Sequence, residues 1–152
     1  MPSSYNYYKN EVKNHLLSFL PKNTKFLDVG AGCGTYAKLL KPEFTDIDAV
    51  EIWKPYIEKY NLNTMYKNIY IDNIVTFDKI SDYQYIILGD VLEHINVYDS
   101  KNLLSKITDL GIKCLVAVPY MYIQGEHDGN VYETHLQPDL TPQIFLERYQ
   151  YM

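Results

Sequence analysis

The sequence predicts an α/β domain in which helices cover both faces of a doubly wound, mostly parallel sheet. Three observations lead to this fold class. The chain has 152 residues, the length of one ordinary domain; short apolar segments alternate with segments of helical periodicity; and a glycine-rich turn follows the first apolar strand-like segment. Strands that alternate with helices form parallel sheets with right-handed crossovers. We therefore expect residues 1–152 to form a single domain.

An N-terminal helix is expected within residues 1–22. Ser3 or Ser4 can cap it, because a hydroxyl oxygen accepts a hydrogen bond from a free amide of the first turn. Apolar residues recur at every fourth position along one stripe: Tyr8, Val12, Leu16 and Leu20. Pro21 ends the helix, since proline lacks the amide that would continue it.

The next segments alternate between strand and helix. Lys25–Val29 is a short apolar segment typical of a buried strand, and the glycine-rich turn Gly30–Gly34 follows it. Helical periodicity resumes over Thr35–Leu40. Ile47–Ile52 is expected to be the second strand, and a helix runs from Pro55 to Tyr60, with proline tolerated in its first turn.

The middle of the chain continues the alternation. Asn68–Ile74 predicts a third strand with a weak pattern, and Tyr83–Leu88 a fourth that is apolar throughout, as a strand covered on both faces is. Asp99 or Ser100 is expected to cap a helix that ends at Gly111.

The C-terminal third is expected to hold one strand, one long loop and one helix. Lys113–Val118 predicts the fifth strand, and residues 120–139 form a polar loop. Thr141 caps the last helix, with Pro142 at its first position.

Composition limits the partners. The 14 basic and 19 acidic side chains give a net charge of −5, which argues against nucleic acid and against an anionic membrane surface. No apolar run approaches the roughly 18 residues of a membrane span. Cys33 and Cys114 form no disulfide framework, and Met1–Asn10 lacks a signal-peptide pattern. We therefore expect a cytoplasmic protein without nucleic-acid or membrane partners.

A ligand site is expected where the parallel strands end, because ligands of such sheets bind beyond the carboxyl ends near the switch point. Glu51 follows Gly30 by 21 residues, close to the roughly 20-residue spacing that places a carboxylate on ribose hydroxyls. The glycine pattern is G-x-G-x-G, one residue shorter than the dinucleotide fingerprint. Asp28 precedes the turn, where a carboxylate suits an ammonium group and repels pyrophosphate; a turn cap is its other reading. These features predict an adenosine-containing cofactor.

Four segments carry a family resemblance: Asp28–Gly34, Asp48–Ile52, Tyr85–His94 and Cys114–Tyr120. With them, residues 24–120 resemble the class I S-adenosylmethionine-dependent methyltransferases. The resemblance implies a Rossmann-like sheet of order 3-2-1-4-5 and S-adenosyl-L-methionine as cofactor.

The resemblance also implies residue roles around the methionine part of the cofactor. The backbone at Gly30 and Gly32 would pass beside it, with Asp28 near its amino group. Gly89 and Asp90 would lie beneath the sulfonium.

Around the adenosine part, the resemblance implies that Glu51 would hold both ribose hydroxyls and that Ile52 would pack on the adenine. Asp72 would accept a hydrogen bond from the adenine amino group, with the Asn73 amide beside it. An ordinary loop aspartate is the other reading of Asp72.

Two histidines are candidate general bases, since imidazole titrates near neutral pH. His94 follows the fourth strand at the mouth of the expected cleft, and His135 lies in the loop after the fifth. A structural bond that fixes the strand-to-helix turn is the alternative role of His94. In the same loop Tyr120, Glu126, Asn130 and Glu133 are candidate substrate-binding residues.

The loop run from Gln124 to His135 is similar to runs in uncharacterised methyltransferase-like proteins, some thought to act on glycans. Its polar groups suit a polyhydroxyl acceptor, but also a divalent metal ion. A solvated loop with a turn at Asp128–Gly129 is the third possibility.

We therefore expect a methyltransferase acting on an oxygen of a small polar acceptor such as a sugar, with His94 or His135 as base. A non-catalytic cofactor-binding module is the alternative, and a nicotinamide-dependent oxidoreductase is disfavoured by the glycine spacing.

The C-terminal antiparallel hairpin of class I methyltransferases is not evident before Met152. An edge at the fifth strand would then need cover, so we expect a homodimer or a neighbouring domain.

Overall fold

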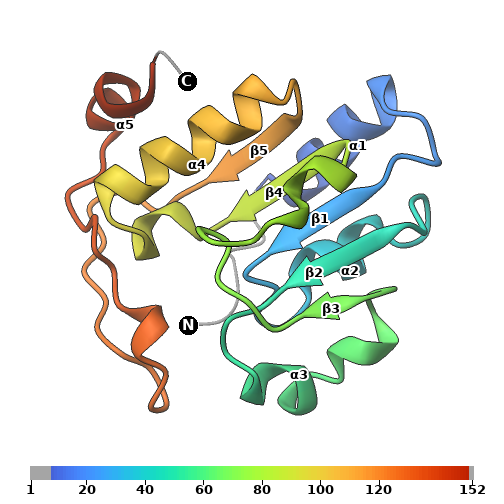
Figure 1. Cartoon of the computed structure of the whole chain (residues 1–152), viewed down its shortest axis with the longest axis horizontal. Helices are drawn as coiled ribbons and strands as arrows, with labels where there is room; N and C mark the ends of the chain where they lie inside the picture. Colours follow the sequence, from blue (N-terminus) through green and yellow to red (C-terminus); the bar gives the residue numbers. More distant parts are fainter. Residues whose placement is uncertain (1–7, 151–152) are drawn as a thin grey trace.

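The computed structural model describes residues 8–150. Its centre is one five-stranded sheet in the order β3-β2-β1-β4-β5, with every neighbouring pair parallel (Figure 1). The strands are β1 (Phe26–Val29), β2 (Ile47–Val50), β3 (Ile69–Tyr70), β4 (Tyr85–Gly89) and β5 (Lys113–Ala117). The predicted fold class and strand order are confirmed.

Helices cover both faces of the sheet, as Figure 1 shows. The helices are α1 (Lys9–Phe19), α2 (Thr35–Leu40), α3 (Pro55–Lys59), α4 (Val97–Asp109) and α5 (Pro142–Tyr149). Side chains of α1, α2 and α3 pack with one set of strand residues, including Phe26 and Ile87, in one apolar cluster. Side chains of α4 and α5 pack with the opposite set, including Leu27 and Leu88, in the second. Alternating strand residues thus fill two core layers, which fixes the strand ends in place.

One expected helix start differs from the one found, and another lies outside the described residues. Helix α1 begins at Lys9 with Tyr8 at its N-cap, whereas Ser3 and Ser4 lie outside the described residues. Helix α4 begins earlier than predicted, because Asn96 is its cap and accepts a hydrogen bond from the Asp99 amide at 2.9 Å. Asp99 and Ser100 are therefore first-turn residues rather than caps.

The predicted cap of α5 is confirmed, since Thr141 Oγ1 accepts from the Ile144 amide at 3.1 Å. Strand β3 is much shorter than the predicted Asn68–Ile74. Asn73 turns the chain there, because its side-chain oxygen accepts from the Val75 amide at 3.0 Å.

The loop of residues 120–139 lies beside the carboxyl ends of the strands (Figure 1). It contains one short 3-10 helix, η4 (Val131–Glu133). Backbone bonds tie the loop to the short 3-10 helix η3 (Leu92–His94), since the Leu136 amide donates to the Glu93 carbonyl at 2.7 Å. These bonds hold the loop as a wall opposite the turns that follow β1 and β2.

Strand β5 is an edge of the sheet, and within residues 8–150 no antiparallel strand joins it. Lys113 is exposed and the other four residues of β5 are half-buried. Among the described helices none has the length and apolar character needed to cross a bilayer.

Candidate active site

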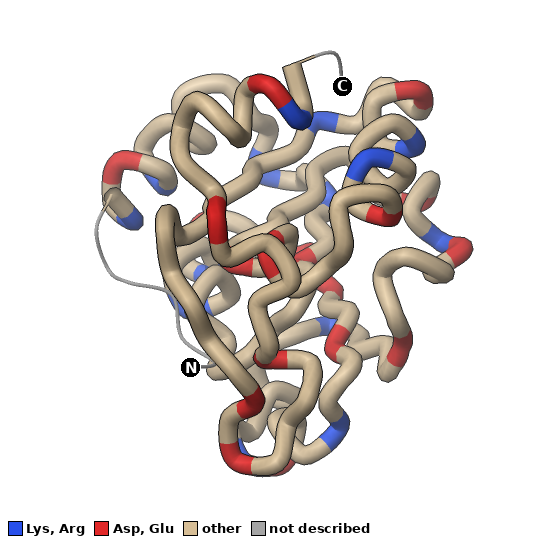
Figure 2. Tube along the Cα trace, turned by 90° about the vertical axis from the view of Figure 1, so that its left-hand side faces the viewer, with Lys and Arg blue, Asp and Glu red and all other residues tan. Residues whose placement is uncertain are grey.

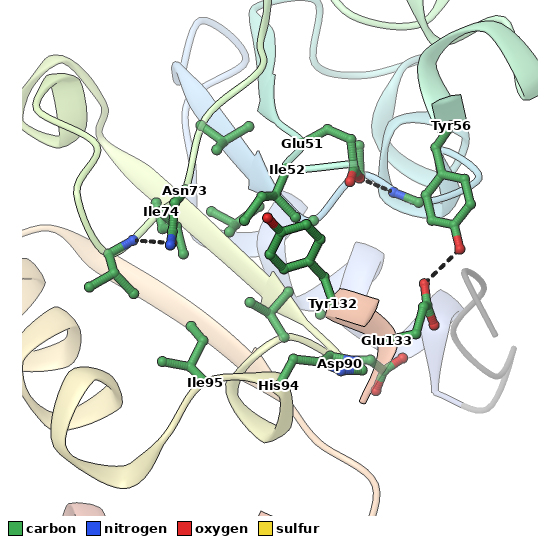
Figure 3. Close-up of a pocket in the computed structure, with 18 of the residues that line it drawn as sticks. Glu51, Ile52, Tyr56, Asn73, Ile74, Asp90, His94, Ile95, Tyr132 and Glu133 are labelled. Carbon is green, nitrogen blue, oxygen red and sulfur yellow. Dashed lines mark hydrogen bonds between the residues drawn. The ribbon is translucent and has the colours of Figure 1, made fainter. Parts of the chain in front are cut away.

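A cavity of about 290 Å³ lies at the carboxyl ends of β1, β2 and β4, bounded on the far side by the loop of residues 120–139. Figure 3 shows Glu51, Ile52 and Asn73 on one side of this pocket and Asp90, His94 and Glu133 on the other. The site lies where the rule for parallel sheets predicts it.

The turn after β1 presents bare backbone to the pocket. Gly30, Gly32 and Gly34 have φ angles of 64°, 51° and 77°, in the left-handed region that glycine adopts without strain. A Cβ atom on Gly30 would lie 2.9 Å from Val91 Cγ2, so a side chain has no room there. A ligand can therefore approach the main chain of this turn closely.

Glu51 lies at the end of β2, with its side chain 3% exposed. Its carboxylate accepts hydrogen bonds from the Gly32 amide at 3.0 Å and the Trp53 amide at 2.8 Å. Burial raises the pKa of Glu51, and these two bonds oppose that rise. Each oxygen keeps a free lone pair, so the carboxylate can still accept hydrogen bonds from two hydroxyl groups of a ligand.

The wall beside Glu51 is apolar, formed by Ile52, Ile74 and Val75. Asp72 and Asn73 are exposed at its rim and also line the pocket. Asp72 accepts from the Asn73 amide at 2.7 Å, which shapes the turn after β3. All four residues predicted for the adenosine part thus lie on one side of the cavity.

Gly89 ends β4, and Asp90 follows it at the pocket floor. A Cβ atom on Gly89 would lie 2.0 Å from the Tyr36 ring, so only glycine fits beneath that ring. Asp90 has a φ of 57°, a conformation that costs a non-glycine residue free energy. Its amide donates to the Ala117 carbonyl at 2.8 Å, which holds this strained residue in place.

Asp28 is not on the pocket wall, in contrast to its expected place beside the cofactor. The side chain is 2% exposed and accepts a hydrogen bond from the Tyr66 hydroxyl at 2.5 Å. Burial raises the pKa of Asp28 to about 7, and the bond from Tyr66 opposes this rise. Its position in the centre of the sheet turns the carboxylate toward the core rather than into the cleft.

Lys9 and Tyr36 form a contact that the sequence does not reveal. Lys9 Nζ donates to the Tyr36 hydroxyl at 2.7 Å and lies 3.9 Å from the centre of its ring. Burial lowers the pKa of Lys9, while the carboxylates of Asp90 and Asp28 act in the opposite direction. The first residue of α1 thus packs behind the pocket floor.

The loop contributes some of its predicted residues but not all. Asn130 and Glu133 line the pocket, together with Tyr132, which the sequence does not single out. Glu133 accepts a hydrogen bond at 2.9 Å from the hydroxyl of Tyr56, a second residue missed by the sequence. Tyr120 and Glu126 are exposed and do not line the cavity, because they precede the segment that turns toward it.

The two candidate bases lie side by side, with ring centres 4.7 Å apart. His94 lines the pocket, and His135 lies behind it. His94 has its pKa lowered by burial and by the neighbouring His135. Glu93, beside them, has its pKa raised to about 8 by burial and by the negative charges of Asp90 and Glu133.

The charge around the cleft is mainly negative. Figure 2 shows Asp and Glu through the middle of the face that includes the carboxyl strand ends. Asp90 and Glu133 carry the negative charge that raises the pKa of the neighbouring Glu93 within the site. This environment favours a ligand that carries positive charge or hydroxyl groups.

Comparison with solved structures finds the same fold in several proteins, methyltransferases among them. An S-adenosylmethionine-dependent methyltransferase from Clostridium acetobutylicum matches with a TM-score of 0.63 at 15% identity, over 79% of this chain and 52% of that chain. The YcgJ protein of Bacillus subtilis matches with a TM-score of 0.66 at 11% identity, over 95% of this chain and 66% of that chain. The sugar N-methyltransferase KedS8 of Streptoalloteichus matches with a TM-score of 0.61 at 13% identity, over 80% of this chain and 52% of that chain. The chain spans about half to two thirds of the length of these proteins.

A comparison with curated protein sequences finds no match. The family model described as "Methyltransferase domain" matches residues 5–111, which is more than half of the chain. The matched region contains the glycine turn, Glu51 and the Asp90–His94 segment. From this match and the Rossmann-like sheet, we conclude that the chain belongs to the class I methyltransferase-domain family.

Proposed function

We propose that the protein binds S-adenosylmethionine in this pocket and transfers its methyl group to an oxygen atom of a small polar acceptor such as a sugar. The observation that carries the proposal is Glu51, held by the Gly32 and Trp53 amides beside a turn of bare backbone. In this reading residues 1–152 act as one methyltransferase domain.

The pocket suits this cofactor in its donor set and in its shape. Glu51 offers two acceptor oxygens to vicinal ribose hydroxyls, and Ile52 and Ile74 offer an apolar face to the adenine. The glycine turn leaves space for the methionine part, and Asp90 places negative charge near the sulfonium. S-adenosylmethionine supplies an activated methyl group, so the protein contributes mainly positioning and exclusion of water.

The acceptor side of the pocket supports a hydroxyl substrate. Asn130 and Glu133 present polar groups to the cavity, and Tyr132 provides an aromatic ring. His94 Nδ1 lies 3.2 Å from the Thr134 carbonyl, which can only accept, so Nδ1 carries the proton and Nε2 is free to accept one. We assign His94 as the group that activates the acceptor oxygen, with His135 positioning it.

The setting proposed is the cytoplasm, since Cys33 and Cys114 are both free thiols.

We also propose that a second copy of the chain or a neighbouring domain covers the edge of β5. Sedimentation of the isolated chain tests the first of these options, and a monomer at every concentration would exclude the homodimer.

Calorimetry with S-adenosylmethionine and S-adenosylhomocysteine tests the cofactor assignment. Binding of both is expected, whereas the absence of binding, or a preference for NAD in thermal shift, would overturn it. A radiolabelled-methyl screen over sugars, nucleotides, lipids and proteins then tests the acceptor. Label in a sugar hydroxyl supports the proposal; cofactor binding without transfer to any pool would indicate a non-catalytic module.

A further inference from the structure

We propose that Glu93, His94 and His135 form a binding site for a divalent transition-metal ion, with Zn²⁺ as the ion that fits best. The side chains of these residues each offer one ligand atom, and the three atoms lie within 4.8 Å of one another. Metal binding goes beyond the proposed methyl transfer and does not depend on it.

The hydrogen bonds of the two imidazoles prepare them as ligands. His135 Nδ1 lies 2.8 Å from the Tyr122 carbonyl, and His94 Nδ1 lies 3.2 Å from the Thr134 carbonyl. A carbonyl oxygen only accepts, so both Nδ1 atoms carry protons and both Nε2 atoms have free lone pairs. Backbone partners of this kind orient the histidine ligands of metal sites.

Glu93 is a buried carboxylate without a partner. Its side chain is 1% exposed, and neither oxygen accepts a hydrogen bond from any described residue. The distance between Glu93 Oε1 and His94 Nε2 is 3.9 Å, too long for a hydrogen bond. A buried polar group left unsatisfied is costly, and a cation between these two atoms would satisfy it.

The main chain holds His135 against Glu93 and His94, although His135 is distant from these two neighbours in sequence. The Glu93 carbonyl accepts from the Leu136 amide at 2.7 Å and from the Gln137 amide at 3.1 Å. Gln137 Nε2 also donates to the Leu92 carbonyl at 2.8 Å. The loop that carries His135 is thereby fixed against the turn that carries Glu93 and His94.

The ligand set selects the class of ion. Two imidazoles and one carboxylate form a set found in catalytic zinc sites, and Mg²⁺ or Ca²⁺ would prefer oxygen ligands. Zinc–nitrogen and zinc–oxygen distances are about 2.0–2.2 Å, so the three atoms must draw together by less than about 1 Å each. Rotation of the Glu93 side chain supplies part of this movement.

The position of the site suggests what the ion does, and this step rests on the proposed function. His94 lines the pocket on the side of Asn130 and Glu133. Three protein ligands would leave a coordination position open, and a hydroxyl bound there would pass its proton to water more readily. With an ion bound, His94 would therefore act on the acceptor oxygen as a ligand of the ion, and in the metal-free protein it would act as the base.

Zinc titration of the untagged full chain tests the site. After removal of metals with a chelator, calorimetry should detect one Zn²⁺ per chain, and Glu93→Gln and His135→Ala should bind it at least about tenfold more weakly. His127→Ala is the matched control, since His127 lies in the same loop with its side chain 40% exposed and outside the cluster. The control should bind as tightly as the wild type.

Absence of Zn²⁺ binding, or equal affinity in all three variants, would overturn the site. A second measurement needs no variant and so avoids loss of folding as an explanation. Co²⁺ added to the metal-free wild type should give the intense visible bands of a site with fewer than six ligands, and Zn²⁺ should abolish them. A spectrum that stays that of aqueous Co²⁺ would also overturn the site.

S-adenosylhomocysteine calorimetry on the same preparations separates this proposal from the methyltransferase function. Loss of Zn²⁺ affinity in Glu93→Gln with cofactor binding intact supports a separate metal site. Cofactor binding by a wild type that binds no Zn²⁺ would refute the metal site and leave the proposed function standing.

Discussion

Glu51 is a residue whose single side chain both shapes the pocket and faces it. Its carboxylate holds the Gly32 and Trp53 amides, so it fixes the turn along which a ligand must pass. The spacing of 21 residues from Gly30 identified this acid from sequence, because strand and turn lengths in this fold vary little.

We expect Glu51→Ala to weaken S-adenosylhomocysteine binding by more than about tenfold, since a charge-assisted hydrogen-bond acceptor is lost. Isothermal titration calorimetry measures the change. Glu58→Ala is the control, because Glu58 is an exposed acid on the following helix and does not line the pocket. Unchanged affinity in Glu51→Ala would show that this acid does not hold the cofactor.

Asp28 is the residue whose predicted place in the site is not found. Sequence position alone places it beside the turn, but its orientation depends on Tyr66, 38 residues away. Long-range contacts of this kind leave no local pattern. The same reason hides Lys9 and Tyr56, which reach the site region from α1 and α3.

The raised pKa of Asp28, about 7, predicts a pH-dependent stability. The folded state retains a proton that the unfolded state loses near pH 4, so this carboxyl reduces stability as pH rises from about 4 to 7. Asp28→Asn lacks this loss of stability. Its free energy of unfolding should exceed that of the wild type by up to about 4 kcal/mol above pH 7, and by little at pH 4. Urea unfolding across this range measures the difference; a difference independent of pH would contradict the assigned pKa.

Among the elements, helix α4 shows why boundaries were harder to predict than the helix itself. The helix ending near Gly111 was predicted with Asp99 or Ser100 as its cap, whereas the residue that caps it is Asn96. Asn96 has the extended conformation of a cap, with φ −65° and ψ 160°, because the chain leaves η3 in that direction. The path of the preceding turn, rather than the local residue types, selects the cap.

Asn96→Ala should destabilise the protein by about 1 kcal/mol, since the Asp99 amide loses its acceptor. Asn102→Ala is the matched control in the same helix, where Asn102 is exposed and alanine favours the helix slightly. Chemical denaturation of both variants gives the comparison. Equal stability of the two would mean that the cap contributes nothing measurable.

For the molecule as a whole, Gln137 joins three elements. Its amide donates to the Leu92 and Ile95 carbonyls at η3 and to Ser100 Oγ in α4, and its oxygen accepts from Arg148 and Tyr149 in α5. Gln137 is 1% exposed, and its bonds to the Leu92 carbonyl and the Tyr149 hydroxyl are buried. The layered sheet was predictable from the repeated strand and helix patterns. This junction was not, because it joins segments that lie up to 45 residues apart in the sequence.

Gln137→Ala should therefore cost about 2 to 4 kcal/mol of unfolding free energy, because carbonyls of the η3 region and the Tyr149 hydroxyl lose buried partners. Gln143→Ala, an exposed glutamine of α5, should change stability by less than about 0.5 kcal/mol. Thermal and urea unfolding measure both. A loss for Gln137→Ala no larger than that of its control would show that the junction is dispensable.

The arrangement of the pocket also bears on how such proteins diverge. The glycine turn, Glu51 and the Asp72–Asn73 rim all precede residue 91, whereas Asn130, Tyr132 and Glu133 come from one later loop. Mutations in the tip of that loop can alter one half of the cavity without touching the other. Its anchors to Glu93 set a limit, since an exchanged loop must keep the amides at positions 136 and 137 in register. Substrate range can thus evolve by replacement of residues between fixed ends.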